Sequence, residues 1–169
     1  MVPAGYLAKR VQKPNGLGIH HLVDVYSVSG HVNDNFADYI KYWKHNGYWL
    51  FDTPEIIRSV ARDNSIQLVG TSLFYYEVYE KEFDGQTWKH YQPESSFDTN
   101  VIPPEDKTLE GFDVVTFYAK NSPECSPLSC NAMANEIRVN EHCLLLSFDD
   151  AEHLINPNRD PIVYSPFIL

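Results

Sequence analysis

Two cysteines and a histidine in the second half of the chain have the types and spacing that could do chemistry. Cys125 lies just before Ser126-Pro127, a pair that is typical of a helix start, and Cys130 falls on the apolar face of that helix. A thiol beside a helix N-terminus has a lowered pKa because exposed backbone amides stabilise the thiolate. With His142 as its base, Cys125 would be the nucleophile of a small thiol-dependent enzyme.

Three other interpretations of these side chains stay open. Cys125 and Cys130 occupy the positions of a hydrophobic staple, so they fit a pair of small buried side chains, and a disulfide between them is a second possibility. A zinc site made of Cys125, Cys130, His142 and Cys143 is the third, because zinc prefers these ligand types. Adjacent residues in an extended strand point to opposite faces, which disfavours zinc. We therefore expect no metal and no cofactor.

A predicted β-hairpin over residues 71–91 offers a different kind of site. Apolar and polar residues alternate over 71–83, Asp84-Gly85 predicts a tight turn, and 87–91 returns as a second strand. Large aromatic rings give contact area at low entropic cost, and carboxylates attract a basic partner. The same face also fits an ordinary amphipathic surface. The candidate partner-binding residues are Tyr75, Glu77, Tyr79, Glu80, Glu82, Trp88 and Tyr91.

The charge of the chain limits the partners that we expect. The 169 residues carry 13 Lys and Arg against 23 Asp and Glu, a net charge of -10, which repels nucleic acid and anionic lipid. Ten of the acids but only three lysines fall between Glu77 and Asp113. Residues 1–10 have no apolar segment of a signal peptide, and no apolar run approaches a membrane span, so we expect a cytoplasmic protein.

The elements that must position these residues are those of a single α+β domain. We expect an irregular arm over residues 1–20, a domain over 21–169 with a long acidic loop at 92–110, and a proline-rich tail that adds an edge strand. The sheet should be mainly antiparallel, with a mixed sheet as the alternative, and no internal repeat is visible. Helices are predicted over 33–46, 54–64, 126–137 and 147–155, and strands over 21–29, 66–69, 71–83, 87–91, 112–118 and 142–146.

The sequence contains no phosphate-binding loop, dinucleotide fingerprint, nucleophile-elbow serine or paired-histidine zinc helix. These absences remove the common nucleotide-binding, hydrolase and metalloprotease functions. The hypothesis that remains is a protein-binding domain, of immunity or inhibitor type, which captures a basic partner through an acidic, tyrosine-rich surface. The alternative is the enzyme that uses Cys125 with His142. The sequence predicts no oligomeric state.

Overall fold

A computed structural model gives the fold of the chain. It describes the backbone of residues 1–12, 21–26, 46, 48, 50–83, 86–90, 100–119, 122–123, 136–154 and 160–168. Within these ranges, side chains are described for residues 1–10, 26, 46, 48, 50–79, 86–87, 100–114, 136–154 and 167–168.

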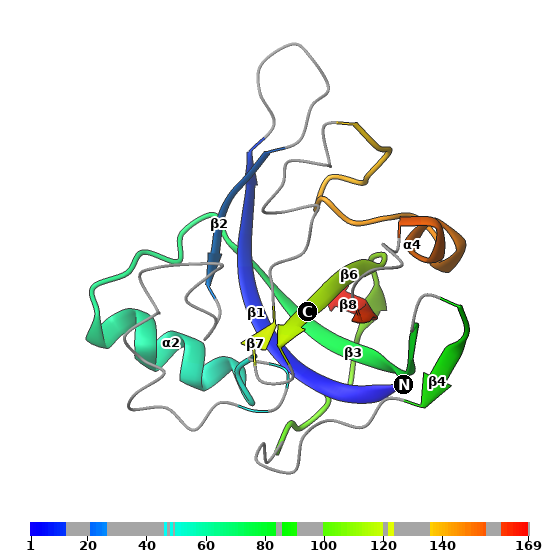
Figure 1. Ribbon diagram of the computed structural model, residues 1–169. Helices are drawn as coiled ribbons and strands as arrows, with labels where there is room; N and C mark the ends of the chain where they lie inside the picture. Colours follow the sequence, from blue (N-terminus) through cyan, green and yellow to red (C-terminus); the bar gives the residue numbers. More distant parts are fainter. Residues whose placement is uncertain are drawn as a thin grey trace.

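The described residues form an α+β fold with one antiparallel sheet and two helices (Figure 1). The sheet runs in the order β2-β1-β3-β8-β6-β7, with β4 added to β3 and β5 added to β8. The helices are α2, Pro54–Asp63, and α4, Phe148–Leu154. The strands are β1, Val2–Gln12; β2, His21–Tyr26; β3, Ser72–Phe83; β4, Trp88–His90; β5, Thr108–Leu109; β6, Asp113–Ala119; β7, Ser122–Pro123; and β8, Asp160–Ile168.

The sheet is symmetric about its central pair of strands. Tyr76 of β3 pairs with Pro166 of β8 at the centre of the sheet. A half turn about this pair moves the Phe74–Ile168 pair onto the Val78–Tyr164 pair. The same half turn takes β1 and its partner β2 onto β6 and its partner β7. Each half also has a helix between its outer strand pair and its central strand. The chain therefore contains an internal structural repeat, which the sequence does not display.

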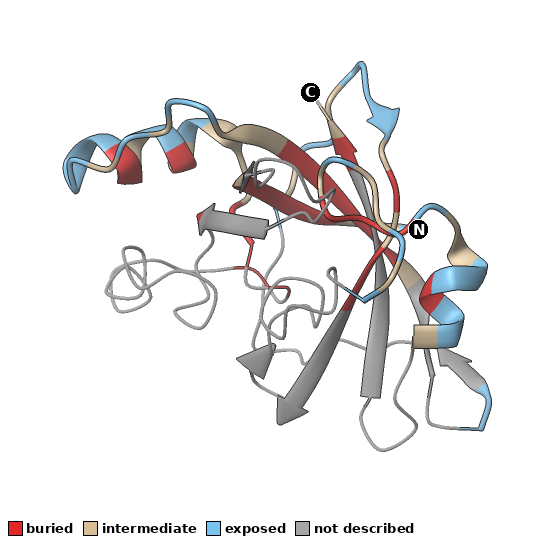
Figure 2. Ribbon diagram, turned by 90° about the horizontal axis from the view of Figure 1, so that it is seen from above, coloured by how far each residue is buried: buried red, intermediate tan, exposed pale blue. Residues whose placement is uncertain are grey.

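Both helices pack where their apolar spacing predicts, and they lie at opposite ends of the sheet (Figures 1 and 2). Ile57, Val60 and Ala61 of α2 are buried against Tyr6, Ala8 and Tyr75. Ala151 of α4 is buried against Val114 and Leu145. A third group of buried residues belongs to the other side of the sheet and joins the two halves. It comprises Ala4, Leu7, Tyr48, Leu50, Phe74, Tyr76, Val78 and Leu144.

Local signals placed both helix starts correctly. Pro54 is the first residue of α2 after Thr53, and Asn64 follows its end. Ser147 precedes α4, where its hydroxyl accepts from the Asp150 backbone N–H at 3.1 Å and donates to the Asp150 carboxylate at 2.8 Å. The other two predicted helices, over 33–46 and 126–137, lie almost wholly outside the described residues. No helix in the described ranges is both long and apolar enough to cross a bilayer.

Three predictions about the strands are wrong. Residues 2–12 form β1 instead of an irregular arm, because β1 finds partners on both sides, in β2 and β3. Residues 66–69 are not a strand. The tail forms β8, which lies between β3 and β6 instead of at an edge. Its prolines are tolerated because each is paired on one side only, Pro161 with β6 and Pro166 with β3.

Candidate functional site

Two asparagine-centred loops each dock on the first strand of their own half of the fold, and the first is built around Asn46. Its fully buried side-chain oxygen accepts the backbone N–H groups of Tyr48 at 3.0 Å and Leu50 at 3.1 Å. Its amide nitrogen donates to the Ala4 carbonyl of β1 at 2.9 Å. The loop then pairs Phe51 with Tyr6 through two backbone hydrogen bonds.

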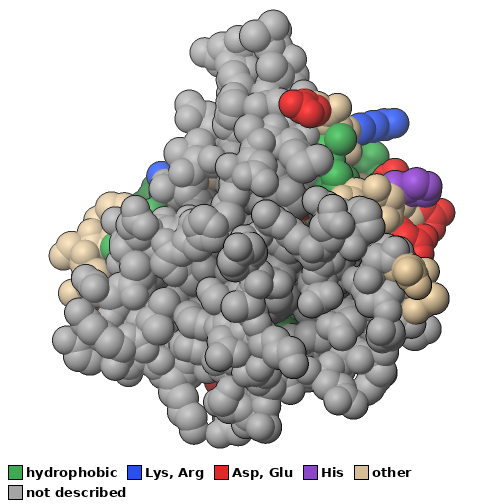
Figure 3. All heavy atoms as spheres, in the orientation of Figure 1, with side chains coloured by type: hydrophobic (Ala, Val, Ile, Leu, Met, Phe, Trp, Pro, Cys, Tyr) green, Lys and Arg blue, Asp and Glu red, His purple; other side chains and the backbone are tan. Residues whose placement is uncertain are grey.

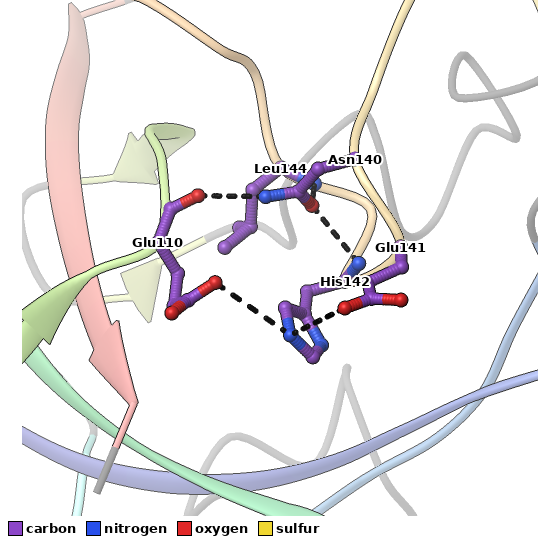
Figure 4. Close-up of polar contacts among 5 residues, drawn as sticks. All are labelled: Glu110, Asn140, Glu141, His142 and Leu144. Atoms are coloured by element: carbon purple, nitrogen blue, oxygen red, sulfur yellow. Dashed lines mark hydrogen bonds and ion pairs between the residues drawn. The ribbon is translucent and has the colours of Figure 1, made fainter.

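The second loop repeats this arrangement around Asn140 (Figure 4). The Asn140 oxygen accepts the N–H groups of His142 at 2.9 Å and Leu144 at 3.0 Å, and its nitrogen donates to the Glu110 carbonyl at 2.6 Å. Leu145 pairs with Phe112, as Phe51 pairs with Tyr6 in the first loop. Neither residue 142 nor residue 143 is in a strand, so the strand predicted over 142–146 is reduced to this one bridge.

A glycine makes room for each asparagine. A Cβ on Gly5 would lie 2.6 Å from the Leu50 Cβ and 2.8 Å from the Asn46 amide nitrogen. A Cβ on Gly111 would lie 2.6 Å from the Leu145 carbonyl oxygen and 2.8 Å from the Leu144 Cβ. In both loops the backbone comes so close to the strand that the strand residue facing it must be glycine. Residues that differ between the two loops are not needed for this docking.

His142 is one such difference, because the equivalent position of the first loop is Tyr48. The His142 ring lies between two carboxylates (Figure 4): its Nε2 is 3.7 Å from Glu110 Oε2 and 3.9 Å from Glu141 Oε1. Its other neighbour is the Phe74 ring, at 5.2 Å between centroids in an edge-on arrangement. These two contacts are ion pairs when the imidazole is protonated. Asn140 fixes the loop and thereby the position of the ring.

Cys143 follows His142 but belongs to the interior. It is fully buried, and burial raises the pKa of its thiol, an effect that Lys9 opposes and Asp113 reinforces. Lys9 is itself only 3% exposed, and its ammonium group lies over the Phe74 ring at 5.4 Å. Burial lowers the pKa of Lys9, while Asp113 and Cys143 act in the opposite direction. The Cys143 thiol is therefore protonated near neutral pH, which is the state of an unreactive core cysteine.

The predicted tyrosine and glutamate surface is only partly accessible to a partner. Tyr75 is 0% exposed, and its hydroxyl donates to Glu77, which is also buried, at 3.3 Å. Lys107 covers both: its ammonium group pairs with Glu77 and lies 5.1 Å from the Tyr75 ring centroid. Tyr79 is half-buried and packs on Phe148. Tyr75 and Glu77 are interior residues because α2 and the segment that carries β5 cover this side of β3.

Several other predicted site residues fall outside the described part of the chain. This applies to Cys125, Cys130 and Tyr91, and to the side chains of Glu80, Glu82 and Trp88. The thiol nucleophile, the disulfide and the cysteine zinc site therefore remain predictions. Within the described residues, no three His, Cys, Asp or Glu side chains are arranged to hold a metal ion.

A pocket beside α4 is the feature of this region that the sequence did not predict. It has a volume of about 370 Å³. Leu146, which is 48% exposed, forms part of its wall. The pocket is lined by the apolar residues Ile137, Leu145, Leu146 and Leu154 and by Arg138, Asp150 and His153. The three consecutive leucines Leu144, Leu145 and Leu146 indicate an exposed apolar side chain here, because three adjacent side chains cannot all point into one core.

The charge around this pocket differs from that around the repeat-equivalent helix. Residues 136–154 contain five acids, all exposed, and a single arginine. The repeat-equivalent residues 42–60 contain two acids and two basic residues in the sequence, with Glu55 and Arg58 paired at 3.0 Å. Figure 3 shows acidic, histidine and hydrophobic side chains gathered at the α4 end, with a basic side chain among them. The acids of the α4 end are Glu136, Glu141, Asp149, Asp150 and Glu152.

Comparison with known proteins found no matching family model, and neither the curated proteins nor the solved structures gave a match.

Proposed function

We propose that the chain is a protein-binding domain that captures a basic partner at the α4 end, in the manner of a small immunity or inhibitor protein. The observation that carries this proposal is the combination of an apolar pocket with five exposed acids on one end of the molecule. Interfaces gain most of their affinity from a few apolar anchors and much of their association rate from charge complementarity. The α4 end supplies both.

The internal repeat strengthens the proposal. The two halves share their strands, their asparagine loops and the placement of their helices, so fold stability accounts for those features. It does not account for the different charge of the two ends. The α2 end is nearly neutral, with its charges paired along the helix, whereas the α4 end has an excess of four acids over basic residues. We assign this excess to partner recognition.

The proposal moves the site from its predicted place. Tyr75 and Glu77, which were expected on the binding surface of β3, are buried. We therefore assign partner binding to the α4 end. The alternative function, a thiol-dependent enzyme, depends on Cys125, which lies outside the described residues. The carboxylates beside His142 do not count against this alternative, because a carboxylate neighbour also orients an imidazole that accepts a proton.

The test uses a short synthetic helical peptide that carries lysines at one-turn spacing around one central leucine. Its association rate should fall about tenfold or more between about 10 mM and about 1 M salt, because the screening length falls from about 30 Å to about 3 Å. Stopped-flow fluorescence anisotropy measures this rate. A rate that is independent of salt would contradict the proposal.

Two paired variants locate the binding site. Asp149→Asn with Glu152→Gln removes two carboxylates from α4, and Glu55→Gln with Asp63→Asn removes two from α2. The α4 pair should weaken peptide binding several-fold, while the α2 pair should leave it unchanged. Equal weakening by both pairs would show that the peptide responds to the net charge of the protein and not to a site.

A further inference from the structure

The pocket beside α4 has a chemistry that specifies more than a basic partner. Its walls are aliphatic, from Ile137, Leu145, Leu146 and Leu154, and its volume of about 370 Å³ is at the small end of ligand pockets, which span roughly 300–1,000 Å³. A space of this size has room for an aliphatic side chain. Its polar groups are at two places, Arg138 from the segment before the Asn140 loop, and Asp150 with His153 from α4.

The shared scaffold does not require this pocket. Six residues after the loop asparagine, the first half has Asp52, whose carboxylate accepts from Asn46 at 3.0 Å. The second half has Leu146 at the same position, 48% exposed. A polar residue that supports the loop is thus replaced by a leucine that contributes to the pocket wall. Leu146 is not an isolated exposed leucine, because it joins Ile137, Leu145 and Leu154 in one apolar wall that charged residues border.

We infer that this pocket receives one aliphatic side chain of the basic partner, with lysine or arginine residues of the partner lying beside it over α4 and away from Arg138. The occupant is a protein segment because the apolar walls select a hydrocarbon side chain, while Asp149, Asp150 and Glu152 select cations on one flank. Arg138 repels cations on the other flank and thereby sets the direction of the segment. This inference rests on the proposed function and names the chemistry of its partner.

The first test changes the peptide probe. The leucine-centred lysine peptide is compared with a matched peptide in which serine replaces the leucine and every lysine is kept. We expect the leucine peptide to bind about tenfold or more tightly, with the same dependence on salt. Equal affinity for the two peptides would overturn the pocket assignment while leaving salt-dependent binding at α4, and hence the proposed function, intact.

The second test changes the protein. Leu146→Ser should remove most of the preference for the leucine peptide and leave the affinity for the serine peptide unchanged. Asp52→Ser, at the equivalent position of the first half, is the matched control and should keep the preference. If Leu146→Ser retains the full preference, the pocket is not the anchor site.

A third measurement needs no variant and therefore does not depend on whether a variant folds. The side-chain methyl NMR signals of Ile137, Leu146 and Leu154 should shift when the leucine peptide is added and should shift much less with the serine peptide. Shifts confined to the methyl groups of α2, Ile56 and Ile57, would place the contact at the other end and overturn the inference. Absence of any salt-dependent binding by either peptide would overturn the proposed function itself.

Discussion

Replacing Asn46 by alanine is the most direct test of how the fold is held together. The side chain is fully buried and makes four hydrogen bonds, two of them as acceptor for the backbone N–H groups of Tyr48 and Leu50. Asn46→Ala leaves these two buried N–H groups without their acceptor. Each unsatisfied group costs about 1–3 kcal/mol, so we expect the free energy of unfolding to fall by about 3–5 kcal/mol.

Two further variants, Asn140→Ala and Asn64→Ala, show how much of the fall in unfolding free energy comes from burial of the asparagine. Asn140→Ala removes the equivalent acceptor from a loop that is only half-buried, where water can replace part of what is lost, so we expect a smaller fall of about 2–3 kcal/mol. Asn64→Ala is the control, because among the described residues its side chain bonds just the Val60 carbonyl, at 2.9 Å and at the exposed end of α2. Its cost should stay below about 1 kcal/mol.

Urea-induced unfolding followed by tryptophan fluorescence gives these values from the shift in midpoint at constant slope. If Asn46→Ala costs no more than Asn64→Ala, the loop is held by its apolar contacts and not by its asparagine. The double variant adds a further check. Leu50 and Leu144 share one core, so the costs of Asn46→Ala and Asn140→Ala should depart from additivity by more than about 0.5 kcal/mol.

Three further outcomes follow from single residues. Burial raises the pKa of Tyr48 to about 12, so the folded state keeps a proton that the unfolded state loses above about pH 10. Stability should fall as the pH rises from about 10 to about 12, by about 1–2 kcal/mol from Tyr48 and further from Tyr6, Tyr75 and Tyr76, whose pKa values burial also raises. A smaller fall in the urea midpoint for Tyr48→Phe than for the wild type over this range checks the share of Tyr48. Gly5→Ala should cost about 2–4 kcal/mol, because φ is +135° and the new Cβ would lie 2.6 Å from the Leu50 Cβ. Gly70→Ala, with φ of +79° and an ordinary contact of 3.7 Å between the new Cβ and the Arg10 side chain, should cost about 1–2 kcal/mol, and equal costs in thermal unfolding would refute the close-approach argument. Cys143 should resist alkylation in the native protein and react on unfolding, as peptide mass spectrometry would show, and rapid native modification would contradict its burial.

Sequence reasoning succeeded where the signal was local. Pro54 marks the start of α2 as its first residue, although the Thr53 side chain makes no capping hydrogen bond. Ser147 caps α4, and β3 with its return strand β4 follows from a short hairpin. It failed where a partner is distant in the chain. Pro3 and Gly5 suggest an irregular arm in isolation, yet β1 is held by β3, about seventy residues away, and the shift in register between Pro3 and Gly5 accommodates that glycine.

The candidate site shows the same limit. The alternation of residues along β3 correctly predicted two faces, but buried clusters cover both of them. Alternation therefore could not tell interior from surface, and Tyr75 was predicted to be exposed although it is buried. The repeat was invisible because the shared structure needs few identical residues: an asparagine, a leucine four residues later, and a glycine on the receiving strand. The pocket lies where α4 packs beside the Asn140 loop, and the hydrophobic periodicity of the sequence does not indicate that contact.

The central position of β8 has a consequence for biosynthesis. Every other described element precedes β8 in the chain, so the ribosome makes β3 and β6 well before the strand that lies between them exists. Until residues 160–168 emerge, both strands present open backbone edges to other chains, which are templates for aggregation. The β3 and β6 edges therefore stay open until residues 160–168 have been made, and a chaperone bound to these edges would prevent them from pairing with other chains.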